Sequence, residues 1–421
     1  MKKKNFIAKN FYRMLAVLTV VALASCKKYN IIGFTPGSGA PTITSVHTWN
    51  KTDTSVYYDT VYTYDASGNI IQTIQARSNR IVPFDSVTNA GNLGWYYIIH
   101  GTNLGSASSI TFNGLPAYFN RALITDTTLI VQVPSKTPYY GPQANDSLVV
   151  TTLNGTASYK FTILPPPPTP TSYSNYNFSA GSQITLAGVG FSSVTSVDIL
   201  GATGSGTTSI ISQNDSVLVL QFNATAVTRG NLVFTYNAGG NSQTQPATQE
   251  LVDLDNAYQV FIDNSLNGWG SWSWGPAGTS TAKVKSGAAS FAAQYGANSW
   301  WIDGFRNGGG GATDGLAYSP DYKYLSFWVY GGSADEKIYI EFGGGPAAGF
   351  NQNQVAANQY DVPPGVWTYY KIPIGNLVWN NIANSGNWAA NSSQPLSTVA
   401  FFMNSNNVVE QLYFDDVILV K

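Results

Sequence analysis

Residues 96–105 read YYIIHGTNLG, a short apolar run followed directly by a turn that contains two glycines and an asparagine. β-Branched and aromatic residues favour extended strands, and glycine and asparagine let the chain reverse direction. A related stretch at residues 181–191 reads GSQITLAGVGF, again with glycines at the end of the apolar run. The sequence therefore predicts a repeated unit that begins with a strand and a glycine-containing turn.

The rest of the chain after residue 40 has the same character. Apolar and polar residues alternate in short runs that glycine, asparagine, aspartate and proline interrupt, and no segment keeps a helical period over three turns. The clearest predicted strands before residue 253 are 96–99, 129–133, 148–153, 159–163, 184–187, 217–222 and 232–236. Strands of this length and spacing predict an all-β chain built of antiparallel sandwiches.

Both repeated units continue in the same order. ITFNG at 110–114 and TLIVQVP at 128–134 follow in the first, and VDIL at 197–200 and VLVL at 217–220 follow in the second. This order resembles the IPT/TIG family of immunoglobulin-like domains. The resemblance implies tandem immunoglobulin-like domains at residues 41–165 and 166–252. Residues 47–90 depart from the pattern, and we expect an inserted hairpin around residues 65–69.

Composition marks the predicted domain boundaries. Residues 164–170 read LPPPPTP, which cannot form a central strand and predicts an extended, semi-rigid spacer. A second boundary is predicted near residues 253–256. Neither immunoglobulin-like segment gathers titratable groups into a cluster, so we interpret both as spacers rather than ligand-binding domains.

Residues 253–421 contain nine of the eleven tryptophans. The predicted strands of this segment are 258–262, 289–293, 324–330, 337–342, 367–374, 399–404 and 411–420. This plan predicts a jelly-roll sandwich. The order of FIDN at 261–264, GW at 268–269, YLSFWVY at 324–330, GVWTYYKIPI at 365–374 and LYFDDV at 412–417 resembles carbohydrate-binding modules.

Five tryptophans form the predicted carbohydrate-binding platform: Trp269, Trp272, Trp274, Trp300 and Trp301. The first three lie in NGWGSWSWG at 267–275, whose glycines and serines predict an exposed loop. The last two are adjacent, so in a strand one of them would be buried and the other displayed. Exposed indoles are flat apolar plates suited to sugar rings, and we expect these to be roughly coplanar. Trp328 and Trp367 lie in apolar predicted strands and are expected in the core.

Nearby polar side chains have two open interpretations. Asn298, Asp303 and Arg306 either bond to sugar hydroxyls or belong to a solvated loop. Each ring laid on a sugar contributes about 1 to 2.5 kcal/mol, which predicts a micromolar to millimolar site after the costs of association. Multivalency then favours a polysaccharide, and flat platforms favour a β-linked one.

The first 25 residues are predicted to be a lipoprotein signal peptide. A lysine-rich start precedes the apolar residues 14–24, which are too few for a stable membrane span. LASC at 23–26 resembles the lipobox of bacterial lipoproteins, which implies that Cys26, the only cysteine, carries acyl chains. Residues 26–40 are then a lipidated tether, and we expect an outer-membrane protein on the cell surface.

Composition and motifs argue against other classes of function. The 421-residue chain has 21 basic and 22 acidic side chains, and the sequence after the signal peptide has no cluster of basic residues. Nucleic acid is therefore not expected as a partner. Glycoside hydrolysis requires two carboxylates, and no motif pairs Glu341 with a second one. There is no serine elbow, histidine cluster for zinc or phosphate loop, so we predict no catalysis. The jelly-roll resemblance also implies a structural calcium ion at Asp263 and Asp416.

The whole chain resembles the surface glycan-binding lipoproteins of bacterial polysaccharide-utilisation loci. The resemblance implies a non-catalytic protein that captures a polysaccharide and passes it to neighbouring outer-membrane uptake proteins. The alternative from another class is a surface adhesin whose tryptophans contact proteins. A glycan-degrading enzyme is the third hypothesis.

Overall fold

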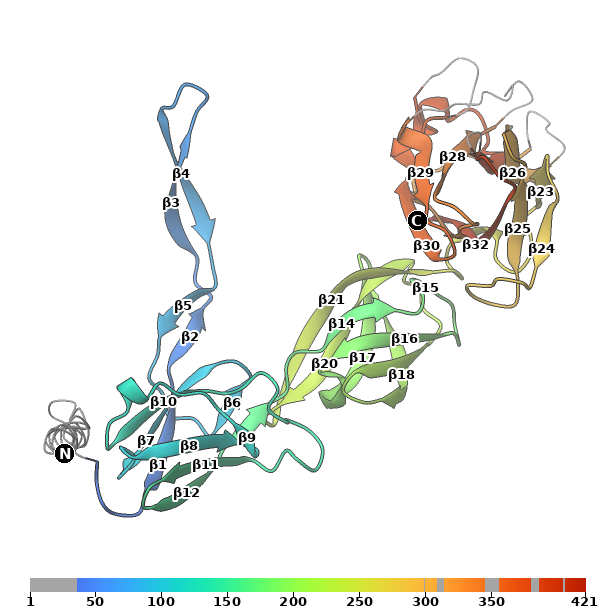
Figure 1. Ribbon diagram of the computed structural model, residues 1–421. Helices are drawn as coiled ribbons and strands as arrows, with labels where there is room; N and C mark the ends of the chain where they lie inside the picture. The colour runs from blue at the N-terminus through green and yellow to red at the C-terminus, as the bar shows by residue number, and fades with distance from the viewer. Residues whose placement is uncertain (1–35, 299, 309–313, 345–355, 380–385, 404–405) are drawn as a thin grey trace, which may run out of the picture. The chain divides into compact units, whose positions relative to one another are not determined.

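A computed structural model describes residues 36–298, 300–308, 314–344, 356–379, 386–403 and 406–421 (Figure 1). The predicted signal peptide and Cys26 lie outside these ranges. The regular elements of the described residues are β-strands and short 3₁₀ turns, which confirms the predicted all-β class. None of the described segments is a helix long and apolar enough to cross a membrane. The chain divides into two compact units at Pro165/Pro166, within the predicted proline spacer.

The first unit is a two-layer sandwich. One layer contains β1 (Thr42–Thr48), β7 (Tyr96–Thr102) and β10 (Thr128–Gln132), and the other contains β12 (Gly155–Lys160), β11 (Ser147–Thr152), β8 (Ala107–Phe112) and β9 (Leu115–Pro116). Strand alternation turns Ile99 and Val131 of the first layer toward Phe112 and Val150 of the second, and these side chains belong to one buried core. A short parallel pair, β6 (Ala90–Asn92) and β13 (Thr162–Leu164), completes the unit.

Between β1 and β6 the chain forms a two-part antiparallel hairpin. β2 (Asn50–Asp53) pairs with β5 (Arg80–Pro83), and β3 (Tyr57–Tyr64) pairs with β4 (Ile70–Arg77). At its tip the Asp65 carboxylate accepts hydrogen bonds from the backbone N–H groups of Ser67 and Asn69 at 2.8 and 2.9 Å. These strands share no sheet with the sandwich.

The second unit begins with another immunoglobulin-like sandwich. Its strands follow one ladder in the order β14 (Thr169–Tyr173), β16 (Gln183–Val189), β19 (Val217–Phe222), β18 (Ser205–Gln213), β17 (Val194–Gly201), β20 (Arg229–Ala238), β21 (Asn241–Asp253) and β15 (Asn177–Phe178). Residues 205–207 of β18 pair with β17 and residues 208–213 pair with β19, so this strand joins the two layers. Pro170 lies in the edge strand β14 beside an irregularity in its pairing, a position where proline is tolerated.

Residues after Asp253 form the second sandwich of this unit. One sheet contains β24 (Ala277–Ser280), β25 (Ser290–Tyr295), β32 (Glu410–Val420), β27 (Tyr324–Tyr330) and β30 (Trp367–Pro373), with β22 (Tyr258–Phe261) paired to β32. The other contains β23 (Trp269–Ser273), β26 (Trp301–Asn307), β31 (Thr398–Met403), β28 (Glu336–Gly343) and β29 (Gln359–Val362). Phe401 and Phe414 stack between the sheets, with ring centroids 4.0 Å apart. We refer to residues 258–421 as the C-terminal sandwich.

The two sandwiches of the second unit share a polar and aromatic contact. The Trp328 indole N–H donates to Asn175 Oδ1 at 3.0 Å, and its ring stacks on Tyr176 with centroids 5.4 Å apart. The Asn177 amide donates to Asp416 Oδ2 at 3.0 Å. Trp328 is buried as the sequence predicts, but it lies outside the main core of the C-terminal sandwich. It is buried because it packs against the preceding immunoglobulin-like sandwich.

An ion-pair network strengthens this contact. Glu250 of β21 accepts hydrogen bonds from Arg229, at 2.7 Å, and from Lys371 of β30. Burial raises the pKa of the Glu250 carboxyl, but the hydrogen bonds and charges of Lys371 and Arg229 outweigh this effect. The pKa of Glu250 therefore lies below its ordinary value of 4.5.

A carboxyl whose pKa is lower in the folded state stabilises the fold above its unfolded pKa, and this contribution is lost as the pH falls through the folded value. We expect Glu250→Gln to lower the free energy of unfolding of the second unit by about 1 to 3 kcal/mol near neutral pH. The difference from the wild type should shrink as the pH falls below about 4.5, where Glu250 is first protonated in the unfolded state, and should vanish below the folded pKa, where it is protonated in both states. Thermal unfolding of both proteins across this range measures it. A difference independent of pH would contradict the role given to Glu250.

Candidate functional site

Strand pairing decides the direction in which each predicted platform tryptophan points. β23 pairs with β26 from Trp269 to Ser273, where the sequence predicts an exposed loop. Alternation turns Trp269 inward, and it is only 5% exposed within the main core. Its indole N–H donates to the Tyr258 hydroxyl at 3.2 Å. The predicted exposure of Trp269 is therefore wrong.

The adjacent pair Trp300 and Trp301 separates as alternation requires. Trp301, the first residue of β26, is half-buried against the main core. Its indole lies against the backbone of Gly296, where a Cβ atom would come within 2.3 Å of it. Trp300 points to the opposite side and is 40% exposed. Of this pair, Trp300 is the one displayed to solvent.

Several aromatic side chains, two of them exposed, lie on the outer side of the sheet that contains β23 and β26. Trp272 pairs with Gly304, and Ile302 pairs with Phe402, which in turn pairs with Tyr339. The N–H of Trp274 continues the ladder to the carbonyl of Ile302 at 2.9 Å. We call this surface the aromatic face and define it by five residues: Trp272, Trp274, Trp300, Tyr339 and Phe402.

Phe402 forms the floor of the aromatic face. It is fully buried in a small apolar cluster with Ile302 and Ala400, separate from the main core. Trp272 and Tyr339 pack on this cluster, and the Trp300 ring centroid lies 5.3 Å from that of Phe402. The rings of Trp300 and Tyr339 are tilted by 60° and 49° to the Phe402 ring. Both rings are therefore inclined to the buried Phe402 ring beneath them, and the coplanarity of the indoles stays a prediction.

Polar groups border the aromatic face. The Arg306 guanidinium lies over the Trp272 ring, 5.2 Å from its centroid, and Gln359 donates to the Tyr339 hydroxyl at 2.9 Å. Asn298 is exposed, with a backbone φ of 52°. Arg306 and Asn298 thus remain candidates for bonding a ligand hydroxyl.

Asp303 and Glu341 are buried, so neither is available to bond a ligand hydroxyl. Asp303 is fully buried on the inner side of β26, where its Oδ1 accepts from the Gly275 N–H at 3.2 Å. Burial raises the pKa of its carboxyl to about 6. Glu341 of β28 is 1% exposed. Neither interpretation of Asp303 from the sequence holds, because it belongs to the interior.

Three further tryptophans of the C-terminal sandwich lie away from the aromatic face. Trp367 is half-buried outside the main core, with its ring 5.5 Å from that of Tyr330, so its predicted core position is wrong. It lies on β30, at the edge of the other sheet. Trp379 and Trp388 are fully buried and stacked with centroids 6.0 Å apart. Sequence reasoning missed both, because they lie outside every predicted strand.

The predicted calcium ligands have other partners. Asp263 Oδ1 accepts from the N–H groups of Ala288 and Ala289 at 2.6 and 2.9 Å. The two oxygens of Asp416 accept from Asn177 and from Ser286. Calcium takes six to eight oxygen ligands. N–H and O–H donors already occupy Asp263 Oδ1 and both Asp416 oxygens, and calcium binding by this pair stays a prediction.

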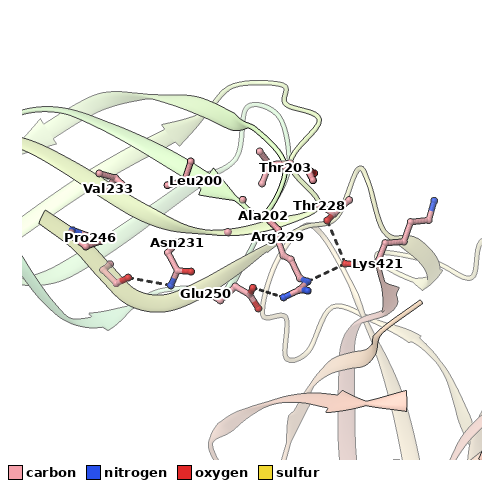
Figure 2. Close-up of a pocket in the computed structure, with 14 residues that line it drawn as sticks. Leu200, Ala202, Thr203, Thr228, Arg229, Asn231, Val233, Pro246, Glu250 and Lys421 are labelled. Carbon is pink, nitrogen blue, oxygen red and sulfur yellow. Dashed lines mark hydrogen bonds and ion pairs between the residues drawn. The ribbon is translucent and has the colours of Figure 1, made fainter. Parts of the chain in front are cut away.

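A pocket of about 670 Å³ lies elsewhere in the second unit (Figure 2). Arg229 and Glu250 form an ion pair there, and the Lys421 carbonyl accepts from Arg229 Nε at 3.2 Å. Its lining residues include no aromatic side chain. It therefore offers no ring for a flat apolar ligand, and the aromatic face is the better candidate site.

The chain is similar in part to several known proteins. No protein-family model matches the chain. An IPT/TIG domain-containing protein of Bacteroides ovatus is 30% identical over 116 residues, which cover 27% of this chain and 24% of that protein. The matched segment thus spans about a quarter of this relative.

Two solved structures are similar over most of their length. The surface glycan-binding protein PbSGBP-B from Prevotella bryantii is 16% identical with a TM-score of 0.45, and the similarity covers 92% of this chain and 99% of that one. SGBP-B from a complex xyloglucan utilization locus in Bacteroides uniformis is 15% identical with a TM-score of 0.37, covering 91% and 99%.

The inward Trp269 of β23 and the outward Trp274, which directly follows β23, should differ in their contribution to stability. Trp269→Ala leaves a cavity in the main core and should cost about 3 to 5 kcal/mol of unfolding free energy. Trp274→Ala, at a site that is 51% exposed, should cost less than about 1 kcal/mol. Urea unfolding followed by circular dichroism compares the two. Equal losses would show that the assigned alternation is wrong.

Proposed function

We propose that the chain is a non-catalytic surface glycan-binding protein that holds a β-linked polysaccharide on the aromatic face. One observation carries the proposal. Trp274 and Trp300 are 51% and 40% exposed on the same side of one sheet, next to Trp272 and Tyr339. Large exposed apolar side chains gathered in one place mark binding surfaces.

The chemistry of the aromatic face suits a sugar chain. Indole and phenol rings offer apolar area to the C–H faces of pyranose rings, at about 25 cal/mol per Å² covered. The guanidinium of Arg306 and the amide of Asn298 can bond to hydroxyl groups beside the rings. Several rings on one face can contact successive sugar units of one chain. We therefore propose a polymer rather than a free monosaccharide as the ligand.

We also propose that the protein lies at the cell surface. A lipid on Cys26 would anchor the chain in the outer membrane at the cell surface, with both immunoglobulin-like sandwiches holding the C-terminal sandwich away from the anchor. Several anchored copies on one polymer would raise the effective affinity of individually weak sites. Neighbouring outer-membrane uptake proteins would then receive the captured glycan.

The adhesin alternative also has an observation in its favour. Apolar side chains of the β3–β4 hairpin are largely exposed, among them Tyr58, Tyr64 and Ile74 at 74%, 73% and 70%. A protein partner could cover such a hairpin. The two functions use different units of the chain, so substitutions on the hairpin and on the aromatic face separate them.

Substitution of one exposed indole should weaken glycan binding. We expect Trp300→Ala to raise the dissociation constant roughly 5- to 30-fold, which corresponds to about 1 to 2 kcal/mol of lost ring contact. The measurement is affinity gel electrophoresis and calorimetry of the full chain against xyloglucan, mixed-linkage β-glucan, mannan and xylan. One similar protein comes from a xyloglucan locus, so xyloglucan is tested first.

Trp367→Ala is the matched control, because it removes a partly exposed indole from the other sheet of the same sandwich. It should bind glycan as the wild type does. Equal weakening by both substitutions would show that the aromatic face is not the site. Absence of binding to every glycan by the wild type would contradict the proposed function itself.

A further inference from the structure

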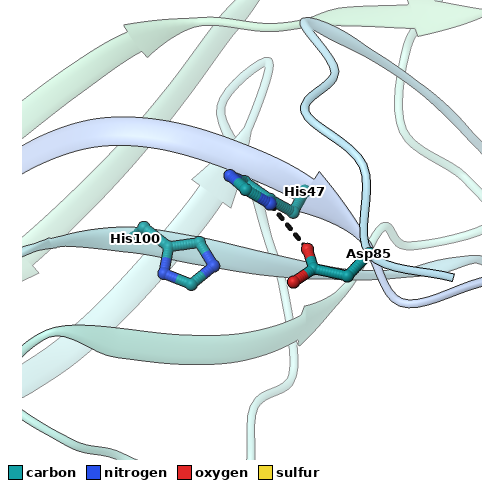
Figure 3. Close-up of side chains that lie close together, drawn as sticks. All are labelled: His47, Asp85 and His100. Atoms are coloured by element: carbon teal, nitrogen blue, oxygen red, sulfur yellow. Dashed lines mark hydrogen bonds and ion pairs between the residues drawn. The ribbon is translucent and has the colours of Figure 1, made fainter.

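The chain has only two histidines, and the fold brings them together. His47 lies on β1 and His100 on β7, in strands that pair directly with His100 opposite Ser45. The two imidazole centroids are 4.4 Å apart (Figure 3). Two imidazoles gain little from this proximity alone, so a shared partner for their nitrogen atoms is worth seeking.

Asp85 supplies a carboxylate at the same place. It follows β5, where the inserted hairpin returns to the sandwich, and its Oδ1 accepts a hydrogen bond from His47 Nδ1 at 2.6 Å. A backbone bridge between His47 and Val87 holds this returning segment against β1. One side-chain atom from each of His47, Asp85 and His100 lies within 4.8 Å of the other two.

The remaining nitrogen atoms have the environment that a metal site needs. His100 Nε2 is buried and has no hydrogen-bond partner among the described residues. His47 Nε2 lies 3.0 Å from Ser45 Oγ, which can accept its N–H and so leave Nδ1 as the ligand atom. Ligating histidines usually donate their second ring N–H to such an outer partner.

We propose that His47, Asp85 and His100 bind a divalent transition metal ion of the zinc type. Two imidazole nitrogens and one carboxylate oxygen are ordinary zinc ligands. The ion takes the place of the proton between His47 Nδ1 and Asp85 Oδ1 and engages the imidazole of His100. The Asp85 side chain is 69% exposed, so water can reach the fourth coordination position.

Such an ion would fix the inserted hairpin to the sandwich. Two of its ligands come from the paired strands β1 and β7, and the third comes from the segment that leaves the hairpin. Because the three residues meet only in the folded chain, the ion would stabilise the folded first unit. The inference is independent of glycan binding, since all three residues lie in the first unit and the aromatic face lies in the second.

The small number of histidines makes the test direct. We would label the full chain with ¹⁵N-histidine, without a polyhistidine tag, and titrate it with zinc chloride while recording ring-nitrogen spectra. Zinc should shift the signals of both histidines together and saturate at about one equivalent. Shifts of one histidine alone, or of neither, would overturn the proposal.

Two variants test the third ligand. Asp85→Asn removes the carboxylate but keeps the size of the side chain, and calorimetry should show at least a roughly tenfold loss of zinc affinity. Asp59→Asn is the matched control, because it removes a carboxylate from the hairpin that is ion-paired only with Arg77 among the described salt bridges. It should bind zinc as the wild type does. Equal affinity in all three proteins would remove Asp85 from the site.

Discussion

The pairing of β23 with β26 is the constraint on which the candidate site depends. It fixes which side chains of two strands point outward, since each strand alternates between its two faces. Trp269 and Trp301 are thereby committed to the interior, and Trp272, Trp274 and Trp300 to the outer side. A shift of one residue in this register would exchange the two sets and remove the aromatic face altogether.

A second constraint acts on the opposite sheet of the C-terminal sandwich. Trp328 of β27 and Asp416 of β32 are buried by contact with the preceding immunoglobulin-like sandwich. Lys371 reaches across to Glu250 at the same contact. Part of this sheet is therefore covered by its neighbour, whereas the exposed Trp274 and Trp300 lie on the outer side of the sheet with β23 and β26.

Much of the fold could be predicted from the sequence, because strand formation is read from local patterns. Residues 324–330 are predicted as a strand and form β27 with the same bounds, since the run is continuously apolar. The strand β23 could not be predicted from its local sequence, because its glycines and serines have a weak preference for strands. Pairing with β26 overrides that weak preference. The prediction that Trp367 lies in the core fails for a related reason, because an apolar strand at a sheet edge can turn a large ring outward.

The candidate site could be predicted only in part. The cluster of tryptophans in the sequence points to the correct region, and three of the five predicted residues share the aromatic face. Tyr339 and Phe402 join them from strands distant in sequence, which no local motif indicates. The meeting of His47 with His100 likewise depends on the register of β1 and β7 and has no signal in the sequence.

Chemical footprinting of tryptophan tests the central claim most directly. The full chain is oxidised briefly, with and without a bound glycan, and the extent of oxidation at each tryptophan is read by peptide mass spectrometry. The account predicts that Trp274 and Trp300 are oxidised readily in the free protein and are protected by the glycan, whereas Trp367 reacts equally in both. Protection confined to other tryptophans, or ready oxidation of Trp269, would contradict it.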